Sequence, residues 1–236
     1  MRGPYGFEVS ENCATRKLRK PDFFCNQDGT TLKDCDAIKS TSLYPSGAVL
    51  FMEKEDARGL FILCEGQVKL SIGSSEGKIL ILGIAKPGEA FGLKAVLGRK
   101  PYQFNAETLR PSQVVFVRGD DFLRFINNHP NVYRNIAQHI VFSYERVCDQ
   151  LRSVGLSSAP RRLAKVLLDW SKARQESTCS RIMMPLTHEE IGEYIGSTRE
   201  TVTRTLSDFK NSQLITVRGA AVTIRDRKAL EKIAVA

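Results

Sequence analysis

The chain has 236 residues, of which 42% are hydrophobic and 26% are charged. At about 150 residues per domain, this length corresponds to one or two domains. The composition lies close to the globular average, which excludes a wholly disordered or a fibrous protein. The 35 Lys and Arg residues outnumber the 26 Asp and Glu residues and give a formal net charge of +9. Such a surplus favours a polyanionic partner, most often nucleic acid, although many basic proteins bind nothing anionic.

The six cysteines of the chain are too sparse for the disulfide-rich folds of small secreted proteins. The chain begins with MRGPYGFEVSENCATRK, which lacks the apolar stretch of a signal peptide. No window approaches the run of about 20 apolar residues that a membrane span needs. We therefore expect a soluble, cytoplasmic protein with reduced thiols and without a membrane partner.

The first domain is predicted from short apolar runs. Residues 1–22 mix polar and charged side chains without a regular period, so we expect a flexible N-terminal arm. A stretch that begins near Cys25 and contains Leu32, Ile38 and Leu43 predicts a helix that leads into the domain. Glycines then separate the runs AVLFM (48–52), LFILC (60–64), QVKLSI (67–72), KILILGI (78–84) and QVVFV (113–117). These runs predict an antiparallel β sandwich or barrel within residues 23–129.

After Asp120 the apolar period becomes helical. The segment DDFLRFINNHP predicts a short helix, and residues 131 to about 156 predict one long helix. One apolar stripe contains Ile136, Ile140, Val147 and Val154, and an adjacent stripe contains Ala137, Val141, Tyr144, Cys148 and Leu151. Two stripes need two covering surfaces, so we expect one stripe to pack on the β domain of the same chain and the other on a second copy.

We therefore assign residues 130–157 to a dimerisation helix, marked by the stripe that contains Ile136 and Val154. A helix buried within the core of one monomer is the alternative. The following segment, GLSSAP (155–160), predicts a hinge before a second domain at 158–236. That domain opens with the amphipathic segment RRLAKVLLDWSKA (161–173), which predicts another helix.

Two short helices follow, each with its own start signal. Thr187 and Glu190 fit a capping box, and Gly196 is a natural helix end. Ser197 and Glu200 fit a second capping box immediately afterwards. The two helices with their glycine-containing turn predict a helix-turn-helix. The runs LITV (214–217) and AVTI (221–224), around a turn at 218–220, predict a β-hairpin wing.

The outer face of the second helix suits the major groove of DNA, which admits one α-helix. Its predicted base-contacting residues, opposite an apolar stripe, are Arg199, Glu200, Thr203 and Arg204. Arginine donates two hydrogen bonds to guanine and glutamate accepts one from cytosine, so Glu200 and Arg204 could share one G·C pair. The alternative is that these two residues form only a solvated surface ion pair. Helix starts and turns bind phosphates, and the predicted phosphate contacts are Thr187, Ser197, Thr198, Thr201 and, on the wing turn, Arg218.

One segment closely resembles the winged helix-turn-helix of CRP/FNR-type transcription regulators. This segment is LTHEEIGEYIGSTRETVTRTLSDFKNSQLI (186–215). Arg199, Glu200 and Arg204 match the family pattern R-E-T-V-x-R, and Thr203 is its variable position. The segments SGAVLF, GLFILCEGQVKL and KPGEAFG resemble the β-roll sensor of the family.

The resemblance implies an α+β fold with a cyclic-nucleotide-binding-like antiparallel β-roll, a long dimerisation helix and a winged helix-turn-helix. It also implies a homodimer that binds an inverted repeat, here with TGTGA-like half-sites, and RNA polymerase as a partner. The alternative is a ligand-binding or protein-interaction module whose winged helix contacts no DNA. No catalytic motif is present, so we do not expect an enzyme.

The resemblance places an effector pocket in the β-roll, at Gly88, Glu89, Gly92, Leu93, Tyr102 and Gln103. In family members that bind cyclic nucleotides, a Glu holds the ribose and an Arg-Ser pair holds the phosphate. The aligned residues here are Leu93, Tyr102 and Gln103. A buried phosphate would lose its charge-assisted bidentate partner at this site. We therefore predict no tight cAMP binding, and we predict no other cofactor.

The cysteines and histidines suggest no metal site. Iron–sulfur ligands are usually closely spaced, whereas Cys13, Cys25 and Cys35 lie far apart in the sequence, so we expect no cluster. A thiol switch that uses these three cysteines is the open alternative. Cys64 and Cys148 are expected to be packing residues, and Cys179 lies in a polar loop. The three histidines are too scattered for a metal site and are explained by helix and cap positions.

Overall fold

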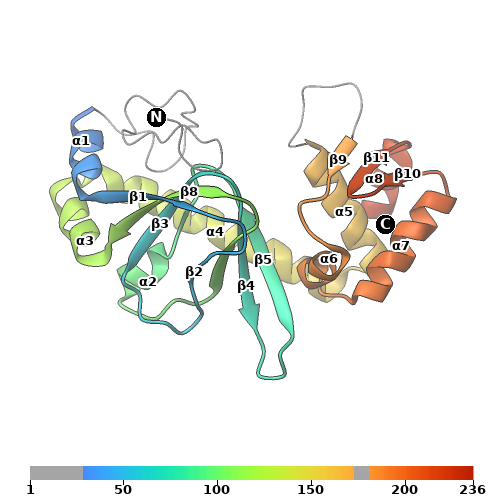
Figure 1. The fold of residues 1–236 in the computed structure, drawn as a ribbon, viewed down its shortest axis with the longest axis horizontal. Helices are drawn as coiled ribbons and strands as arrows, with labels where there is room; N and C mark the ends of the chain where they lie inside the picture. Colours follow the sequence, from blue (N-terminus) through green and yellow to red (C-terminus); the bar gives the residue numbers. More distant parts are fainter. Residues whose placement is uncertain (1–28, 173–180, 236) are drawn as a thin grey trace. The chain divides into compact units, whose positions relative to one another are not determined.

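The computed structural model describes residues 29–172 and 181–235, so the predicted arm at 1–22, Cys13, Cys25 and Cys179 lie outside the described residues. The chain divides into two compact units (Figure 1). Of the described residues, the N-terminal unit comprises 29–78 and 82–146, and the C-terminal unit comprises 79–81, 147–172 and 181–235. Within the described residues, no helix is both long and apolar enough to cross a membrane.

The N-terminal unit is built from two four-stranded sheets. One sheet has the strand order β1-β8-β3-β6, and the other has the order β2-β7-β4-β5. The paired strands for which a register is known run antiparallel. The strands are β1 (Lys39–Tyr44), β2 (Val49–Phe51), β3 (Gly59–Glu65), β4 (Val68–Gly73), β5 (Ile79–Ala85), β6 (Ala90–Phe91), β7 (Asn105–Thr108) and β8 (Ser112–Arg118). The predicted antiparallel β-roll is thereby confirmed.

Each of the five apolar runs forms a strand, but the polar strand β1 was not predicted. It pairs with β8 from Lys39↔Val117 to Tyr44↔Ser112. Within the described residues, the predicted first helix is confirmed over α1 (Gly29–Ile38), whereas Leu43 lies in β1. The sequence of β1, KSTSLY, has no apolar run, so its partner strand rather than its own pattern determines its conformation.

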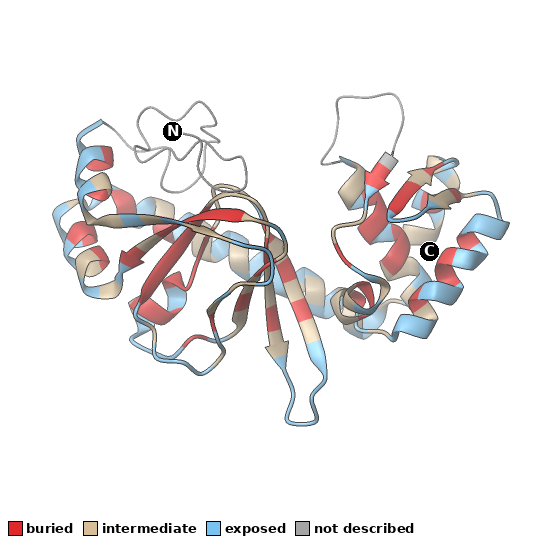
Figure 2. Ribbon diagram, viewed as in Figure 1, coloured by how far each residue is buried: buried red, intermediate tan, exposed pale blue. Residues whose placement is uncertain are grey.

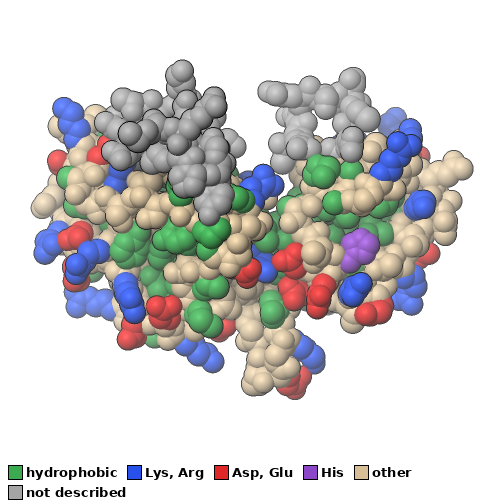
Figure 3. All heavy atoms as spheres, in the orientation of Figure 1, with side chains coloured by type: hydrophobic (Ala, Val, Ile, Leu, Met, Phe, Trp, Pro, Cys, Tyr) green, Lys and Arg blue, Asp and Glu red, His purple; other side chains and the backbone are tan. Residues whose placement is uncertain are grey.

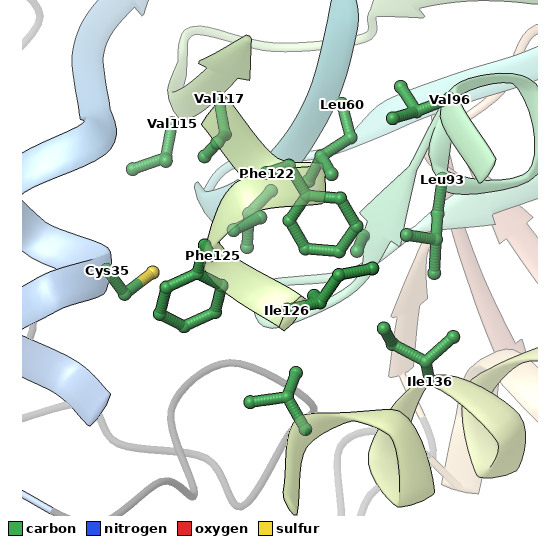
Figure 4. Close-up of a cluster of buried hydrophobic side chains, with 13 residues drawn as sticks. Cys35, Leu60, Leu93, Val96, Val115, Val117, Phe122, Phe125, Ile126 and Ile136 are labelled. Carbon is green, nitrogen blue, oxygen red and sulfur yellow. The ribbon is translucent and has the colours of Figure 1, made fainter. Parts of the chain in front are cut away.

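Helices cover one side of the N-terminal unit. They are α1, α2 (Leu93–Gly98), α3 (Gly119–Asn128) and the first turns of α4 (Asn131–Leu156). Phe122, Phe125 and Ile126 of α3 belong to one buried cluster with residues of β3 and β8, and Figure 4 shows Phe125 beside Cys35 of α1 and Ile126 on the side of Leu93 and Ile136. The short helix predicted from DDFLRFINNHP and the long helix predicted after it are both confirmed.

The long helix α4 buries only a small part of its apolar surface. Ile136 is 4% exposed within the core of the N-terminal unit, and Ile140 packs against that core. Val147 is exposed, whereas Val154 is half-buried and approaches Gly196. Three residues of the other stripe are also exposed, namely Val141, Tyr144 and Leu151. Their neighbour Phe142 is exposed as well.

The C-terminal unit packs helices against a small sheet with the order β10-β11-β9. Its elements are α5 (Ala159–Lys172), β9 (Arg181–Met183), α6 (His188–Ile195), α7 (Arg199–Asn211), β10 (Ile215–Arg218), β11 (Ala221–Ile224) and α8 (Arg227–Val235). The helix-turn-helix and the hairpin are therefore confirmed, while β9 and α8 are additional elements. Figure 2 shows buried residues along the inner sides of these helices and exposed residues along their outer sides.

Candidate nucleic-acid interface

The turn between α6 and α7 brings their backbones into close contact. Gly196 ends α6 with a left-handed φ of 62°, and the Ser197 N–H donates to the Gly192 carbonyl over 2.8 Å. A Cβ added to Gly192 would stand 2.8 Å from the Ser197 carbonyl oxygen and 3.3 Å from the Arg199 nitrogen. Only glycine fits at position 192 without displacing the start of α7. This requirement was not predicted from the sequence, although a glycine within a predicted helix was the available signal.

The start of each helix is fixed by a threonine. Thr187 and Glu190 form the predicted capping box, with the Glu190 N–H donating to Thr187 Oγ1 over 3.2 Å and Glu190 Oε2 accepting from the Thr187 N–H over 3.0 Å. The second capping box was wrong by one residue. Thr198, not Ser197, caps α7, and its Oγ1 accepts from the Thr201 N–H over 3.3 Å. Ser197 is still part of the turn, because its N–H is bound to Gly192.

The outer face of α7 presents the four residues predicted to contact bases. Arg199, Glu200, Thr203 and Arg204 are all exposed. The opposite face anchors the helix through Val202, Leu206 and Phe209, which are 0%, 4% and 5% exposed. This burial confirms the predicted inward-facing stripe and leaves the outer face accessible to a ligand.

Glu200 is an ionised hydrogen-bond acceptor on this face. Its own backbone N–H, then the Thr198 hydroxyl and the charge of Arg199, hold the pKa of the Glu200 carboxyl below its usual value. Among the described residues, no ion pair joins Glu200 to Arg204. The carboxylate and the guanidinium are therefore not paired with each other.

The residues predicted to contact phosphates lie at the starts of α6 and α7 and on the hairpin. Thr187 and Thr198 are exposed N-caps, whereas Ser197 and Thr201 are half-buried. Arg218 is exposed and ends β10 opposite Ala221, so it lies beside the two-residue tip of the hairpin. Basic and acidic side chains are interspersed on the surface that Figure 3 shows, so no large patch of one charge is visible there.

Arg162 of α5 forms hydrogen bonds to the turn of the helix-turn-helix and to the end of α4. Its Nη1 donates to the carbonyls of Val154 and Ser157 over 2.6 and 3.0 Å, and its Nη2 donates to the Gly196 carbonyl over 3.3 Å. Burial lowers the pKa of this guanidinium. The bonds join the end of α4 to the turn that orients α7. Sequence reasoning missed this role, because the carbonyls come from segments that only the fold brings together.

The predicted effector-pocket residues are largely structural in the N-terminal unit. Leu93 is 2% exposed in the core, and Gln103 is exposed. Tyr102 is 3% exposed, and its hydroxyl donates to the Gly59 carbonyl over 2.6 Å. Burial raises the pKa of Tyr102. Gly88 and Gly92 adopt left-handed φ values, and Glu89 forms an ion pair with Arg146 over 2.9 Å.

Aromatic rings fill the space between the two sheets. The ring of Tyr102 stacks on Phe51 with centroids 3.9 Å apart, and Phe61 lies 5.3 Å from Phe51. Phe91 and Phe104 also lie within about 6 Å of the Phe51 ring centroid. A phosphate among these rings would be surrounded by apolar side chains.

The described cysteines and histidines form no metal-binding cluster. Cys35 is 5% exposed in the helix-covered core, where Figure 4 shows its sulfur near Phe125. Cys64 and Cys148 are half-buried. Within the described residues there is no group of three or more metal-ligating side chains.

Comparisons with known proteins agree with this architecture. A model of the cyclic nucleotide-binding domain matches residues 42–129, and a model of the Crp-like helix-turn-helix domain matches residues 161–233. The structure of FixK2 from Bradyrhizobium japonicum has a TM-score of 0.75 at 22% identity, covering 84% of this chain and 98% of that one.

Curated relatives extend the agreement along the sequence. The transcriptional activatory protein AadR from Rhodopseudomonas palustris is 28% identical over 98% of this chain and 95% of its own length. A CRP-like cAMP-activated global transcriptional regulator from Mycobacterium tuberculosis is 28% identical over 80% of this chain and 85% of its own. Together with the β-roll and the helix-turn-helix, these matches show that the chain belongs to the CRP/FNR family of DNA-binding transcription regulators.

Proposed function

We propose that this regulator acts as a homodimer, binds an inverted repeat with TGTGA-like half-sites, and responds through its β-roll to a signal other than cAMP. The domains keep the boundaries predicted from the sequence, with a sensor at 23–129, a dimerisation helix at 130–157 and a DNA-binding domain at 158–236. The proposal includes RNA polymerase as a partner and a cytoplasmic location, and it includes no catalytic activity or cofactor.

The observation that carries the proposal is the exposed polar face of α7. Arg199 and Arg204 are exposed and would donate bidentate hydrogen bonds to guanine, and the ionised Glu200 would accept from the amino group of cytosine. Thr187 and Thr198 cap the two helices of the motif and Arg218 lies on the wing, where they would contact phosphates. The four base-contacting residues and their surroundings thus suit one half-site in a major groove.

Support for self-association comes from the apolar stripe of α4. Val141, Tyr144, Cys148 and Leu151 follow the alternating spacing of three and four that forms a coiled-coil seam, and the first, second and fourth of these are exposed. Pairing this stripe with that of a second copy would remove it from water. A two-fold dimer would present two copies of α7, which matches an inverted-repeat site.

A signal other than cAMP is supported by the interior of the β-roll. The M. tuberculosis relative is described as cAMP-activated. In this chain, Tyr102 occupies the position expected for the phosphate-binding arginine and is stacked on Phe51. Leu93, at the position of the ribose-binding Glu, is 2% exposed in the core. A nucleotide at these positions would have to displace packed side chains.

The proposal is tested by anisotropy titrations of labelled duplexes with and without the TGTGA-like inverted repeat, in the presence and absence of cAMP. Wild type should prefer the repeat, and cAMP should not change that preference. Arg199→Ala and Arg204→Ala should each weaken specific binding by about 1–3 kcal/mol, roughly 5- to 150-fold, because each removes base contacts.

Lys210→Ala is the matched control, because Lys210 is an exposed basic residue in the last turn of the same helix. It should leave the preference between duplexes unchanged. Arg218→Ala should weaken binding to both duplexes alike and reduce its salt dependence. If the double variant of Arg199 and Arg204 kept the wild-type preference and salt dependence, the DNA-contact model would be wrong.

A further inference from the structure

His188 connects the first helix of the motif to the recognition helix. It is the first residue of α6, and its Nδ1 lies 3.1 Å from Thr203 Oγ1 in the second turn of α7. Thr203 is exposed on the face assigned to base contacts. The hydrogen bond therefore joins a residue outside that face to a hydroxyl on it.

Other hydroxyl groups on α7 bond differently. Thr205 Oγ1 donates to the Thr201 carbonyl over 2.8 Å, and Ser207 Oγ donates to the Thr203 carbonyl over 3.0 Å. Such bonds to the preceding turn are one of the two rotamer choices open to a helical threonine. The Thr203 hydroxyl instead bonds to a ring on another helix. Its rotamer is thus chosen by His188 and not by the backbone of α7.

The backbone on both sides holds this bond in place. The capping box at Thr187 fixes the residue immediately before His188. The close approach of Gly192 to Ser197 fixes the spacing of the two helices. Because neither end of the bond lies on a free loop, the backbone keeps the ring and the hydroxyl within reach of each other.

We propose that His188 is a specificity-determining positioning residue, which orients the Thr203 hydroxyl and thereby sets the base pair preferred beside it. This inference rests on the proposed function of α7. A neutral imidazole has one donor and one acceptor nitrogen. If Nδ1 accepts, the Thr203 oxygen offers lone pairs to the amino groups of adenine or cytosine. If Nδ1 donates, the Thr203 O–H can turn to the acceptors of guanine or thymine.

The experiment first selects the preferred inverted repeat of the wild-type protein from a randomised library. Affinities are then measured for symmetric duplexes that carry each of the four base pairs at each half-site position. His188→Gln removes the polar atom from the Nδ1 position, whereas His188→Asn keeps one close to it. His188→Gln should reduce discrimination at one position about 2- to 10-fold, and His188→Asn should restore part of it.

Two further variants separate positioning from a general structural effect. Thr203→Val keeps the shape but lacks the hydroxyl, so His188→Gln should have no further effect on discrimination in that background. Ser207→Ala, which removes a hydroxyl bound to its own helix, is the control and should leave all preferences unchanged.

Three outcomes are distinguishable. If wild type selects no repeat, the proposed function itself fails. If wild type is specific but His188→Gln keeps the same preference at every position, the inference about His188 is wrong. It is also wrong if His188→Gln alters discrimination equally in the presence and absence of the Thr203 hydroxyl.

Discussion

The two units differ in where their predicted ligand-contacting residues lie. In the C-terminal unit, the residues predicted to contact bases are exposed and rest on a separate buried layer that includes Val202 and Leu206. In the N-terminal unit, two residues at predicted effector positions, Leu93 and Tyr102, are themselves part of the buried layer. In the C-terminal unit, the predicted contact residues are thus distinct from the residues that stabilise the fold. In the N-terminal unit, residues at the predicted effector positions also stabilise the fold.

This difference has an energetic consequence. Replacing exposed side chains without special contacts changes stability by only about 0.5 kcal/mol, so the residues of α7 predicted to contact bases can be replaced with little loss of stability. Residues between the two sheets of the β-roll carry packing energy, so a change there alters stability before it alters ligand binding. Mutations that change ligand binding alone should therefore lie on α7, whereas mutations between the sheets of the β-roll should change stability first.

The largest effect is expected for Phe51→Ala. Phe51 is 2% exposed and stacks on Tyr102, and it also lies near Phe61, Phe91 and Phe104. Its truncation should reduce the free energy of unfolding by about 3–5 kcal/mol, because it removes apolar contacts and leaves a cavity. Urea unfolding followed by circular dichroism measures the loss.

Met52 provides the control, because it is the next residue and is 60% exposed. Met52→Ala should change the free energy of unfolding by less than about 0.5 kcal/mol. Fluorescence of Trp170, the single tryptophan of the chain, reports on the C-terminal unit. Equal unfolding midpoints for the two variants would show that the aromatic cluster is not the structural core of the β-roll.

A smaller effect is expected for Gly192→Ala in the C-terminal unit. The new Cβ would meet backbone atoms of Ser197, Thr198 and Arg199, which cannot move without shifting the start of α7. We expect a loss of about 1–3 kcal/mol in unfolding free energy and weaker DNA binding as well. Unfolding monitored by Trp170 fluorescence and anisotropy titration of the operator measure these two effects.

Gly155→Ala is the matched control, because a Cβ there would meet nothing within 4 Å and Gly155 lies within α4. It should be neutral or stabilise the protein by up to about 1 kcal/mol, since alanine favours helix more than glycine does. If Gly192→Ala and Gly155→Ala changed the unfolding free energy and DNA binding alike, the spacing of α6 and α7 would not require a glycine at position 192.

The sequence predicts the C-terminal unit in more detail than the N-terminal unit because its signals are local. The capping box at Thr187, the end of α6 at Gly196 and the hairpin each involve residues close together in the chain. The error at Ser197 shows the limit, since two adjacent hydroxyl residues fit a cap equally well until the turn selects Thr198. Strand β9 was missed because it forms by pairing with β11, as in Met183↔Ala221.

The missed features of the sites depend on contacts between distant segments. The family resemblance predicts that Tyr102 stands at the position of an arginine, but only the fold shows its ring stacked on Phe51. The exposed face of α7 follows from helical periodicity, whereas the bonds of Arg162 to Val154 and Gly196 require the positions of three segments. His188 was explained by its place near a cap, and its bond to Thr203 follows from the angle of the turn.

The smallest effect is a pH dependence that distinguishes the N-terminal unit through His139. Burial, opposed by Glu89 and the Ala90 backbone and assisted by Arg146 and Lys94, lowers the pKa of His139 from its ordinary value of 6.5. The unfolded chain therefore binds more protons than the folded chain between the lowered pKa and 6.5. Stability is greatest above 6.5 and falls as the pH drops through that value toward the lowered pKa.

His139→Gln should make the unfolding free energy of the N-terminal unit less dependent on pH between about 7.5 and about 5.5. Its effect on the C-terminal unit should be the same at both pH values, because the proton-linked group is absent from that unit's core. Hydrogen–deuterium exchange of peptides from each unit, in wild type and variant, measures the two separately. If the variant kept the wild-type pH dependence of exchange in the β-roll peptides, His139 would not be the titrating group. The pH dependence of stability would then come from other titratable groups, of types that both units contain.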